Sequence, residues 1–224
     1  PGTVAGLFAS HKYARLPFTT LIAPAIELAD KGFVVTAREA NSLNNMKPVF
    51  LRYNQSPPVF TREVPWREGD TLVQKDLAKT LIRIRDQGMK GFYEGETARL
   101  IVEEMKRANG IISLEDLKNY TATERKAVVF PYKGYDILTM PLPSSGGIIL
   151  PQLMKTMEKR NLAAKGFHSP EAVQLMIEAE RRSYADRSEF LGDADFVKVP
   201  VKRLISDSYL EERMKDFVPG KAGN

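Results

Sequence analysis

Apolar residues recur along most of this chain at i, i+3, i+4 and i+7, the spacing of amphipathic helices. Val4, Leu7, Phe8 and His11 form the first such stripe, and Pro17 is expected to end its helix. Similar patterns predict further helices over residues 19–31, 36–46, 70–87, 96–108, 113–120, 147–157, 170–188 and 206–217. About eight or nine helices are therefore expected, with no internal repeat and no low-complexity segment.

Capping residues mark several of the expected helix ends. Thr19 or Thr20 is suited to cap the second helix, and Gly32 supplies the left-handed residue that ends it. Thr36 is predicted to cap a short helix that ends near Met46. Later helices are expected to begin at the caps Ser113 and Ser169, the second of which precedes Pro170 at the first helical position.

The pattern changes from helix to strand over residues 127–140. Residues 127–130 and 135–140 are β-prone, and Gly134 lies in the short stretch between them, as in a tight hairpin loop. Residues 47–69 hold four of the 14 prolines and the single Trp, and are predicted to be irregular. The expected fold class is mainly α with one β-hairpin. We expect residues 1–224 to form a single fragment without a clear domain boundary. Residues 47–69 are the weakest point, where a boundary would fall if there were one.

Composition narrows the classes of function. Of the 224 residues, 43% are hydrophobic and 27% charged, as in ordinary globular proteins, and no apolar run is long enough to span a bilayer. The net charge of +5 comes from basic residues interleaved with acidic ones, so no nucleic-acid partner is predicted. The absence of cysteine excludes disulfides, thiolate metal sites and a cysteine nucleophile. Because the sequence opens on Pro1 without a methionine or a leader, we expect an internal piece of a longer protein.

The stretch Ser144-Ser145-Gly146-Gly147 is the strongest candidate for a functional turn, since it joins a β-prone run to a helix. Its outline is that of a nucleophile elbow, but the Gly-x-Ser-x-Gly spacing is missing. The glycine spacings of phosphate-binding loops are missing too. We therefore favour a structural interpretation, in which serine caps the helix and the glycines allow close backbone approach.

Histidines and carboxylates offer no complete catalytic or metal-binding set. His11 lies on an apolar stripe and His168 in a loop, and neither has a partner at metal-ligand spacing. Glu180 falls in line with apolar residues of its helix, so we expect it to be partly buried and paired as a structural carboxylate, rather than to act as a general base. The acidic residues Asp186, Glu189, Asp193 and Asp195 lack the ligand pattern of a calcium loop.

Several stretches resemble the γ-glutamyltranspeptidase family, in the same order and with consistent spacing. The most specific are Met-Pro-Leu-Pro-Ser-Ser-Gly-Gly-Ile at residues 140–148 and Glu-Ala-Glu-Arg-Arg-Ser-Tyr-Ala-Asp-Arg-Ser-Glu-Phe-Leu-Gly-Asp at residues 178–193. Supporting stretches are residues 1–6, 23–33, 69–78, 91–93 and 112–117. The family-marked positions that the resemblance implies are Ser144, Ser145, Gly146, Gly147, Glu180, Asp186 and Arg187, which we expect to be structural and near the site.

The resemblance implies that this chain is an internal part of the large-subunit region of an N-terminal-nucleophile hydrolase with an αββα fold. Such an enzyme is a self-cleaving precursor, whose small subunit begins with a threonine that attacks a γ-glutamyl amide, for example that of glutathione. Water, an amino acid or a peptide then resolves the acyl-enzyme, with no metal or cofactor. In the family, the nucleophile, the oxyanion hole and the substrate-binding arginine belong to segments outside residues 1–224, so no catalytic residue is assigned in this chain.

Further expectations also follow from the resemblance. The small subunit of the same precursor is the implied partner, and the implied location is periplasmic or extracellular. The chain alone should be inactive and should self-associate through apolar surface. The alternatives are a related glutaryl-cephalosporin acylase, a poly-γ-glutamate depolymerase, and a non-catalytic helical interaction module.

Overall fold

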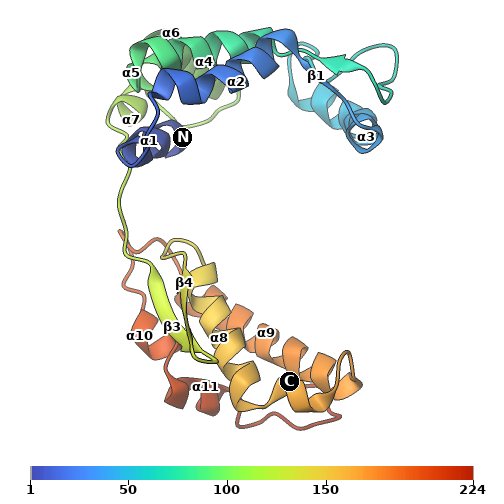
Figure 1. Cartoon of the computed structure of the whole chain (residues 1–224), viewed down its shortest axis with the longest axis vertical. Helices are drawn as coiled ribbons and strands as arrows, with labels where there is room; N and C mark the ends of the chain where they lie inside the picture. Colours follow the sequence, from blue (N-terminus) through green and yellow to red (C-terminus); the bar gives the residue numbers. More distant parts are fainter. Residues whose placement is uncertain (1, 224) are drawn as a thin grey trace. The chain divides into compact units, whose positions relative to one another are not determined.

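A computed structural model describes residues 2–223 of the chain, which fall into two compact units, Pro1–Thr123 and Glu124–Asn224 (Figure 1). Pro1, which opens the first family-like stretch, and Asn224 lie outside the described residues. The division falls in residues 121–127, which have no regular structure. Residues 47–69, the weakest point expected from the sequence, lie within the first unit.

The regular structure of the first unit, in the part that the structure describes, is helical except for two very short strands. Its elements are α1 (Gly2–His11), α2 (Phe18–Lys31), β1 (Phe33–Val34), α3 (Ala37–Tyr53), β2 (Thr71–Leu72), α4 (Lys75–Gln87), α5 (Lys90–Tyr93), α6 (Gly95–Arg107) and α7 (Leu114–Lys118). The helices α2 and α4 lie side by side, and the core gathers apolar residues from α1, α4, α5, α6 and α7. The hydroxyl of buried Tyr93 accepts a hydrogen bond from the backbone N–H of Ala5 at 3.1 Å, which ties α1 to that core.

Some of the predicted helix ends are confirmed and others are wrong. Thr36 caps α3 in a capping box with Glu39. Gly32 ends α2 with a φ of 86°, a conformation that glycine adopts without strain. The second helix, in contrast, begins directly after Pro17, so Thr19 and Thr20 lie inside its first turn and neither caps it.

The helix expected to end near Met46 instead continues as α3 to Tyr53, with Pro48 inside it. Tertiary contacts account for this extension. The side-chain amide of Asn44 donates to the carbonyl of Trp66 at 2.9 Å and accepts from the backbone N–H of Trp66 at 2.8 Å. The irregular segment after the helix is thereby tied to the turn that precedes Pro48, which offsets the helix-breaking tendency of the proline.

The second unit contains the predicted hairpin, which is confirmed, and a helical layer. Its elements are β3 (Val128–Tyr132), β4 (Tyr135–Thr139), α8 (Gly146–Lys159), η1 (Leu162–Lys165), α9 (Pro170–Phe190), α10 (Val201–Leu204) and α11 (Asp207–Arg213). The strands pair antiparallel from Val128 opposite Thr139 to Tyr132 opposite Tyr135. The helix α8 contacts both the hairpin and α9, so it forms the centre of this unit.

The fold class needs one correction, because a second two-stranded sheet joins β1 to β2. Phe33 lies opposite Leu72, and Val34 lies opposite Thr71. Strands of two residues are too short to show the period-2 alternation by which strands are recognised. Over residues 2–223, the chain is therefore mainly helical with two small antiparallel sheets. None of the described helices has the length and apolar character that a membrane span requires.

Candidate functional site

The turn at residues 144–147 leads directly into α8. Ser145 already has helical backbone angles, with φ −66° and ψ −20°, and its side chain makes no capping hydrogen bond. The expectation that a serine of this turn caps the helix is therefore wrong, since Ser145 holds the capping position and its side chain makes no capping bond. The expected close approach is confirmed at Gly147, which is buried, because a Cβ atom there would collide with the carbonyl oxygen of Met140. Gly146 has more room, since its Cβ would meet only the Ser144 hydroxyl, at 3.4 Å.

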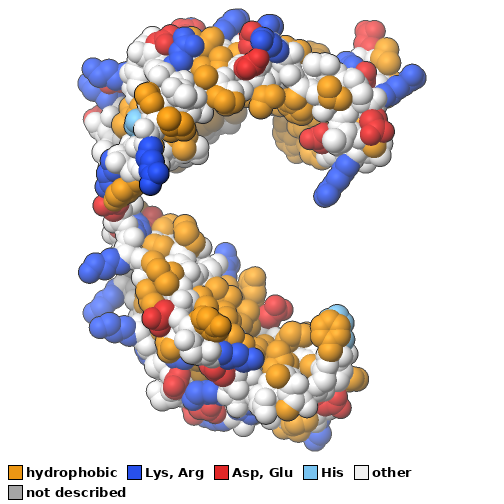
Figure 2. Space-filling model, viewed as in Figure 1, with side chains coloured by type: hydrophobic (Ala, Val, Ile, Leu, Met, Phe, Trp, Pro, Cys, Tyr) orange, Lys and Arg blue, Asp and Glu red, His pale blue; other side chains and the backbone are white. Residues whose placement is uncertain are grey.

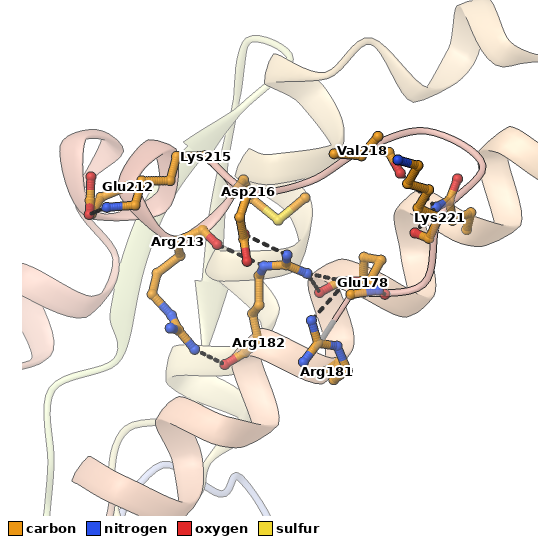
Figure 3. Close-up of polar contacts among 12 residues, drawn as sticks. Glu178, Arg181, Arg182, Glu212, Arg213, Lys215, Asp216, Val218 and Lys221 are labelled. Atoms are coloured by element: carbon orange, nitrogen blue, oxygen red, sulfur yellow. Dashed lines mark hydrogen bonds and ion pairs between the residues drawn. The ribbon is translucent and has the colours of Figure 1, made fainter.

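Several polar side chains occupy buried positions of α9, where sequence patterns predict apolar ones. Figure 3 shows two of them, Glu178 and Arg182, with their partners. Glu178 and Arg182 are only 5% and 6% exposed and form an ion pair one helical turn apart. Arg182 also donates to the carboxylate of Asp216 at 2.7 Å and to the backbone carbonyl of Arg213 at 2.7 Å. One guanidinium thus joins α9 to the end of α11 and the segment that follows it.

The carboxylate of Glu178 has a second set of donors. The backbone N–H of Gly223 donates to it at 3.0 Å, and the Arg181 guanidinium donates at 3.0 Å. The hydrogen bond from Gly223 is the largest cause that lowers the pKa of Glu178 to about 2, and Arg182 and Arg181 add to it against the opposing effect of burial. Glu178 is therefore a charged structural group and unsuited to accept a proton as a general base.

A second buried carboxylate, Asp186, joins three helices. It accepts hydrogen bonds from the Gln152 side-chain amide at 2.8 Å and from the Tyr209 hydroxyl at 2.9 Å, and the Nε atom of Arg213 lies 3.0 Å from it. Burial, together with the hydrogen bond to Asp186, raises the pKa of Tyr209 to about 12. Asp186 therefore connects α8, α9 and α11.

A third group of hydrogen bonds, made by the side chain of Gln174, holds the end of the described chain on α9. The side chain of Gln174 donates to the carbonyls of Val218 and Lys221 at 3.1 and 2.7 Å and accepts from the N–H of Gly220 at 2.8 Å. With the bond from Gly223 to Glu178, these contacts fasten residues 218–223 along one side of the helix.

The expectation for Glu180 is wrong. Glu180 is exposed, as is Arg187, and the buried carboxylates of α9 are Glu178 and Asp186. The expectation rested on an apolar stripe, three members of which are themselves exposed, Val173 at 36%, Ile177 at 56% and Tyr184 at 55%. The helix therefore presents those apolar residues outward.

The family-marked positions thus have different surroundings. Asp186 lies in the polar cluster, and residues 144–147 begin the helix whose Gln152 contacts Asp186. Glu178, Arg182 and Gln152 were not among the site residues expected from the sequence. The available signal was the four-residue spacing that places Glu178, Arg182 and Asp186 on one face of α9, whereas Gln152 lies on α8.

The two histidines have structural surroundings. The Nε2 atom of His11 lies 2.9 Å from the carbonyl of Leu16, and its ring meets Phe18 edge-on with centroids 5.6 Å apart. His168 stacks on Phe167 with centroids 3.9 Å apart. Over residues 2–223, no group of three or more His, Cys, Asp or Glu side chains is placed to hold a metal ion.

Comparison with known proteins gives consistent matches along the chain. Residues 1–223 match the family model described as gamma-glutamyltranspeptidase. The glutathione hydrolase proenzyme of Escherichia coli K12 is 43% identical over 212 residues, which is 93% of this chain and 37% of that protein. The capsule biosynthesis protein CapD proenzyme of Bacillus anthracis is 39% identical over 212 residues, or 94% of this chain and 39% of that protein.

A solved structure extends the match from sequence to fold. The crystal structure of Helicobacter pylori gamma-glutamyltranspeptidase superposes with a TM-score of 0.93 at 43% identity, covering 100% of this chain and 65% of that one. In sequence, the present chain spans less than two fifths of the length of the E. coli and B. anthracis proenzymes named above.

Proposed function

This chain belongs to the γ-glutamyltranspeptidase family, and we propose that it is part of the large-subunit region of an enzyme that cleaves the γ-glutamyl amide of glutathione. The observation that carries this proposal is the match to the family over residues 1–223, with 43% identity to a glutathione hydrolase proenzyme. We propose that the nucleophile is the threonine that begins the small subunit of the same precursor, outside residues 1–224.

In the proposed reaction, the hydroxyl oxygen of the threonine at the start of the small subunit attacks the γ-carbonyl carbon of the substrate. The amide C–N bond breaks, the amine leaves with a proton, and the γ-glutamyl group remains as an ester on the enzyme. Water or the amine of an acceptor then attacks the ester, which releases glutamate or a new γ-glutamyl compound and restores the hydroxyl group. We propose that no residue of the present chain forms or breaks a bond in these steps.

The role we propose for this chain is to support the catalytic sheets. The hairpin β3–β4 has one face toward α8, where Phe130 is buried, and one open face on which Val129 and Leu138 lie opposite each other, 52% and 69% exposed. An isolated two-stranded hairpin is marginal in water, and an apolar open face favours packing against another layer. We propose that strands from the rest of the precursor cover this face and complete the αββα arrangement.

The family-marked residues have structural roles in this proposal. Residues 144–147 let the start of α8 approach the end of β4, and Asp186 fixes α8, α9 and α11 to one another. We further propose a periplasmic or extracellular location for the intact protein. Cell fractionation of the source organism tests that location, and activity confined to the cytoplasmic fraction would contradict it.

The test of function is an assay of the intact precursor and of the 224-residue chain on γ-glutamyl-p-nitroanilide, with and without glycylglycine as acceptor. We expect p-nitroaniline release that saturates with substrate for the matured precursor and no turnover for the chain alone. Turnover by the chain alone would contradict the proposal that the catalytic residues belong to the rest of the precursor. Absence of turnover by a precursor that has cleaved itself would contradict the substrate assignment.

The family resemblance leaves a poly-γ-glutamate depolymerase as a second candidate, and the 39% identity to the capsule biosynthesis protein CapD proenzyme shows that relatives outside the glutathione hydrolases are similar to this chain. A panel of γ-glutamyl-p-nitroanilide, glutaryl-7-aminocephalosporanic acid and poly-γ-glutamate distinguishes the family members. We expect the highest kcat/KM on the γ-glutamyl anilide, and a preference for either of the other two substrates would identify a depolymerase or an acylase.

A further inference from the structure

Two buried polar atoms of the second unit have no hydrogen-bond partner among the described residues. They are the side-chain carbonyl oxygen of Gln152, on α8, and the Nε atom of Arg213, at the end of α11. Gln152 as a whole is 2% exposed. Buried donors and acceptors are nearly always paired in native proteins, so two unpaired polar atoms in one unit call for an explanation.

Reversing the amide of Gln152 does not satisfy its oxygen. The amide nitrogen donates to the Asp186 carboxylate at 2.8 Å and to the carbonyl of Leu204 at 3.1 Å. The reversed amide would direct an oxygen at two acceptors, so the present orientation is the favourable one. The side-chain oxygen therefore needs a donor from elsewhere.

The N–H group at Nε of Arg213 is the second buried group without a hydrogen-bond partner, and it is a donor where the Gln152 oxygen is an acceptor. Its nitrogen lies 3.0 Å from an Asp186 carboxylate oxygen, yet the pair does not have the geometry of a hydrogen bond. The charges attract, but the N–H does not point at the carboxylate. The Nη2 atom of the same guanidinium donates to the backbone carbonyl of Arg182 at 3.2 Å, which fixes its orientation.

Both side chains line the same small cavity between α8, α9 and α11. The cavity holds about 10 Å³, and its wall also includes the hydroxyl-bearing residue Ser183 and the carboxylate-bearing Asp186. This volume is close to the lower limit for one water molecule, and a buried water needs two to four polar partners. The Ser183 hydroxyl donates to the carbonyl of Ala179, so its oxygen remains able to accept.

We propose that this cavity is a binding site for one structural water molecule. The water accepts from Arg213 Nε and donates its two protons to Gln152 Oε1 and Ser183 Oγ, which satisfies both unpaired atoms. A cation is disfavoured by the Arg213 guanidinium, and an anion by the Asp186 carboxylate, so a neutral molecule with both donors and acceptors fits best. The bound water thereby joins α8, α9 and α11 at their common contact.

A crystal structure of the protein, at a resolution that shows ordered water, tests the proposal directly. We expect one density peak within about 2.7–3.2 Å of both Gln152 Oε1 and Arg213 Nε. The variant Gln152→Leu should lose the peak. The matched variant Gln174→Leu, which changes a glutamine outside the cavity, should keep it.

A measurement in solution supplies an independent readout that does not require the variants to fold. A water molecule held in this cavity for nanoseconds or longer gives negative nuclear Overhauser effects to nearby backbone amides, among which we expect those of Ser183 and Arg213. A dry cavity in the crystal, or a Gln152 oxygen that accepts from a protein donor instead, overturns the proposal. Loss of the peak in Gln174→Leu as well would also count against a site specific to Gln152.

Discussion

Arg182 directs its guanidinium at acceptors from three separate parts of the second unit. It contacts Glu178 on its own helix, the backbone of Arg213 at the end of α11, and Asp216 in the segment beyond. Burial works to lower the pKa of Arg182, but the hydrogen bonds to Asp216 and Glu178 outweigh that effect and raise it. A buried charge of this kind is tolerated because each side of the guanidinium meets an acceptor.

Removing one member of this group should be costly. We expect Glu178→Gln to lower the free energy of unfolding by about 3 kcal/mol, near the lower end for breaking a buried ion pair, because Arg182 retains Asp216. The control is Glu180→Gln, the same change on an exposed position of the same helix, which should stay within about 0.5 kcal/mol. Urea unfolding of both variants measures the difference, and equal values would contradict the structural role of Glu178.

The pKa of Glu178 also predicts a pH dependence. It falls from its ordinary value of 4.5 to about 2 in the folded chain, so the unfolded chain binds the proton first as the pH drops. The resulting stabilisation, about 3 kcal/mol, is complete above pH 4.5 and is lost as the pH falls toward 2. Urea unfolding between pH 7 and pH 2 should show this loss in the wild type. The Glu178→Gln variant should have a shallower slope in that window, and parallel slopes would exclude Glu178 as the source.

At the scale of single elements, similar sequence signals have different outcomes. Thr36 and Ser113 both cap helices through complete capping boxes, with Glu39 and Asp116 as the reciprocal partners. Ser145 occupies the same formal position before α8 but makes no capping bond, because its own backbone is already helical. The difference lies in the backbone angles of the capping residue, which are extended at Thr36 and Ser113.

This difference can be measured by matched substitutions. We expect Thr36→Ala to destabilise the chain by about 1 kcal/mol, the usual cost of a lost helix cap. Ser145→Ala should change stability by less than about 0.5 kcal/mol, since no capping bond is lost. Thermal unfolding followed by circular dichroism gives both values. A cost at Ser145 as large as that at Thr36 would mean that its hydroxyl acts through another contact.

Much of the fold was predictable because long amphipathic patterns and caps act locally. Most of the helices, the hairpin and the caps of α3, α7 and α9 follow from residues close in sequence. The continuation of α3 through Pro48 was not predictable, since it depends on Asn44 meeting Trp66, 22 residues away. The pairing of β1 with β2 joins strands of two residues across an intervening helix, and no local pattern signals that.

The candidate site was predictable only in part, for a related reason. Periodicity identifies faces by assuming that apolar residues point inward, and α9 departs from that assumption because charged residues share its buried face with Ala172, Leu175 and Ala179. Its inward positions include Glu178, Arg182 and Asp186. Glu178 pairs with Arg182 on the same helix, while Arg182 and Asp186 also pair with Asp216 and Arg213 from later in the chain. The resemblance to a family marked Asp186, but only the three-dimensional contacts identify its partners.

At the scale of the whole molecule, both units leave large apolar side chains exposed (Figure 2). The most exposed include Ile111 at 94%, Phe167 at 92%, Phe196 at 87% and Leu138 at 69%. Extended apolar surface on a soluble protein usually marks a contact with something else. Within the proposed function, that contact is the remainder of the precursor.

We therefore expect the 224-residue chain to self-associate when it is produced alone. Sedimentation velocity at increasing concentration should show the average mass rising above that of a 25.2 kDa monomer. Replacing Val129 and Leu138 together by threonine, which keeps β propensity but reduces apolar area, should weaken this association. The matched control is a double change of Arg99 and Lys31 to glutamine on exposed helix surfaces, and a monomer at all concentrations would contradict the expectation.

The polar contacts along α9 also bear on which changes of length this helix tolerates. Gln174, Glu178, Arg182 and Asp186 follow one another at intervals of four residues, and each is bonded to a different neighbour. Deleting one residue between Glu178 and Arg182 would turn one half of the helix by about 100° relative to the other. Either Gln174 and Glu178 or Arg182 and Asp186 would then face away from their partners. Insertions and deletions should accumulate in residues 191–200 instead, where no helix or strand sets a register.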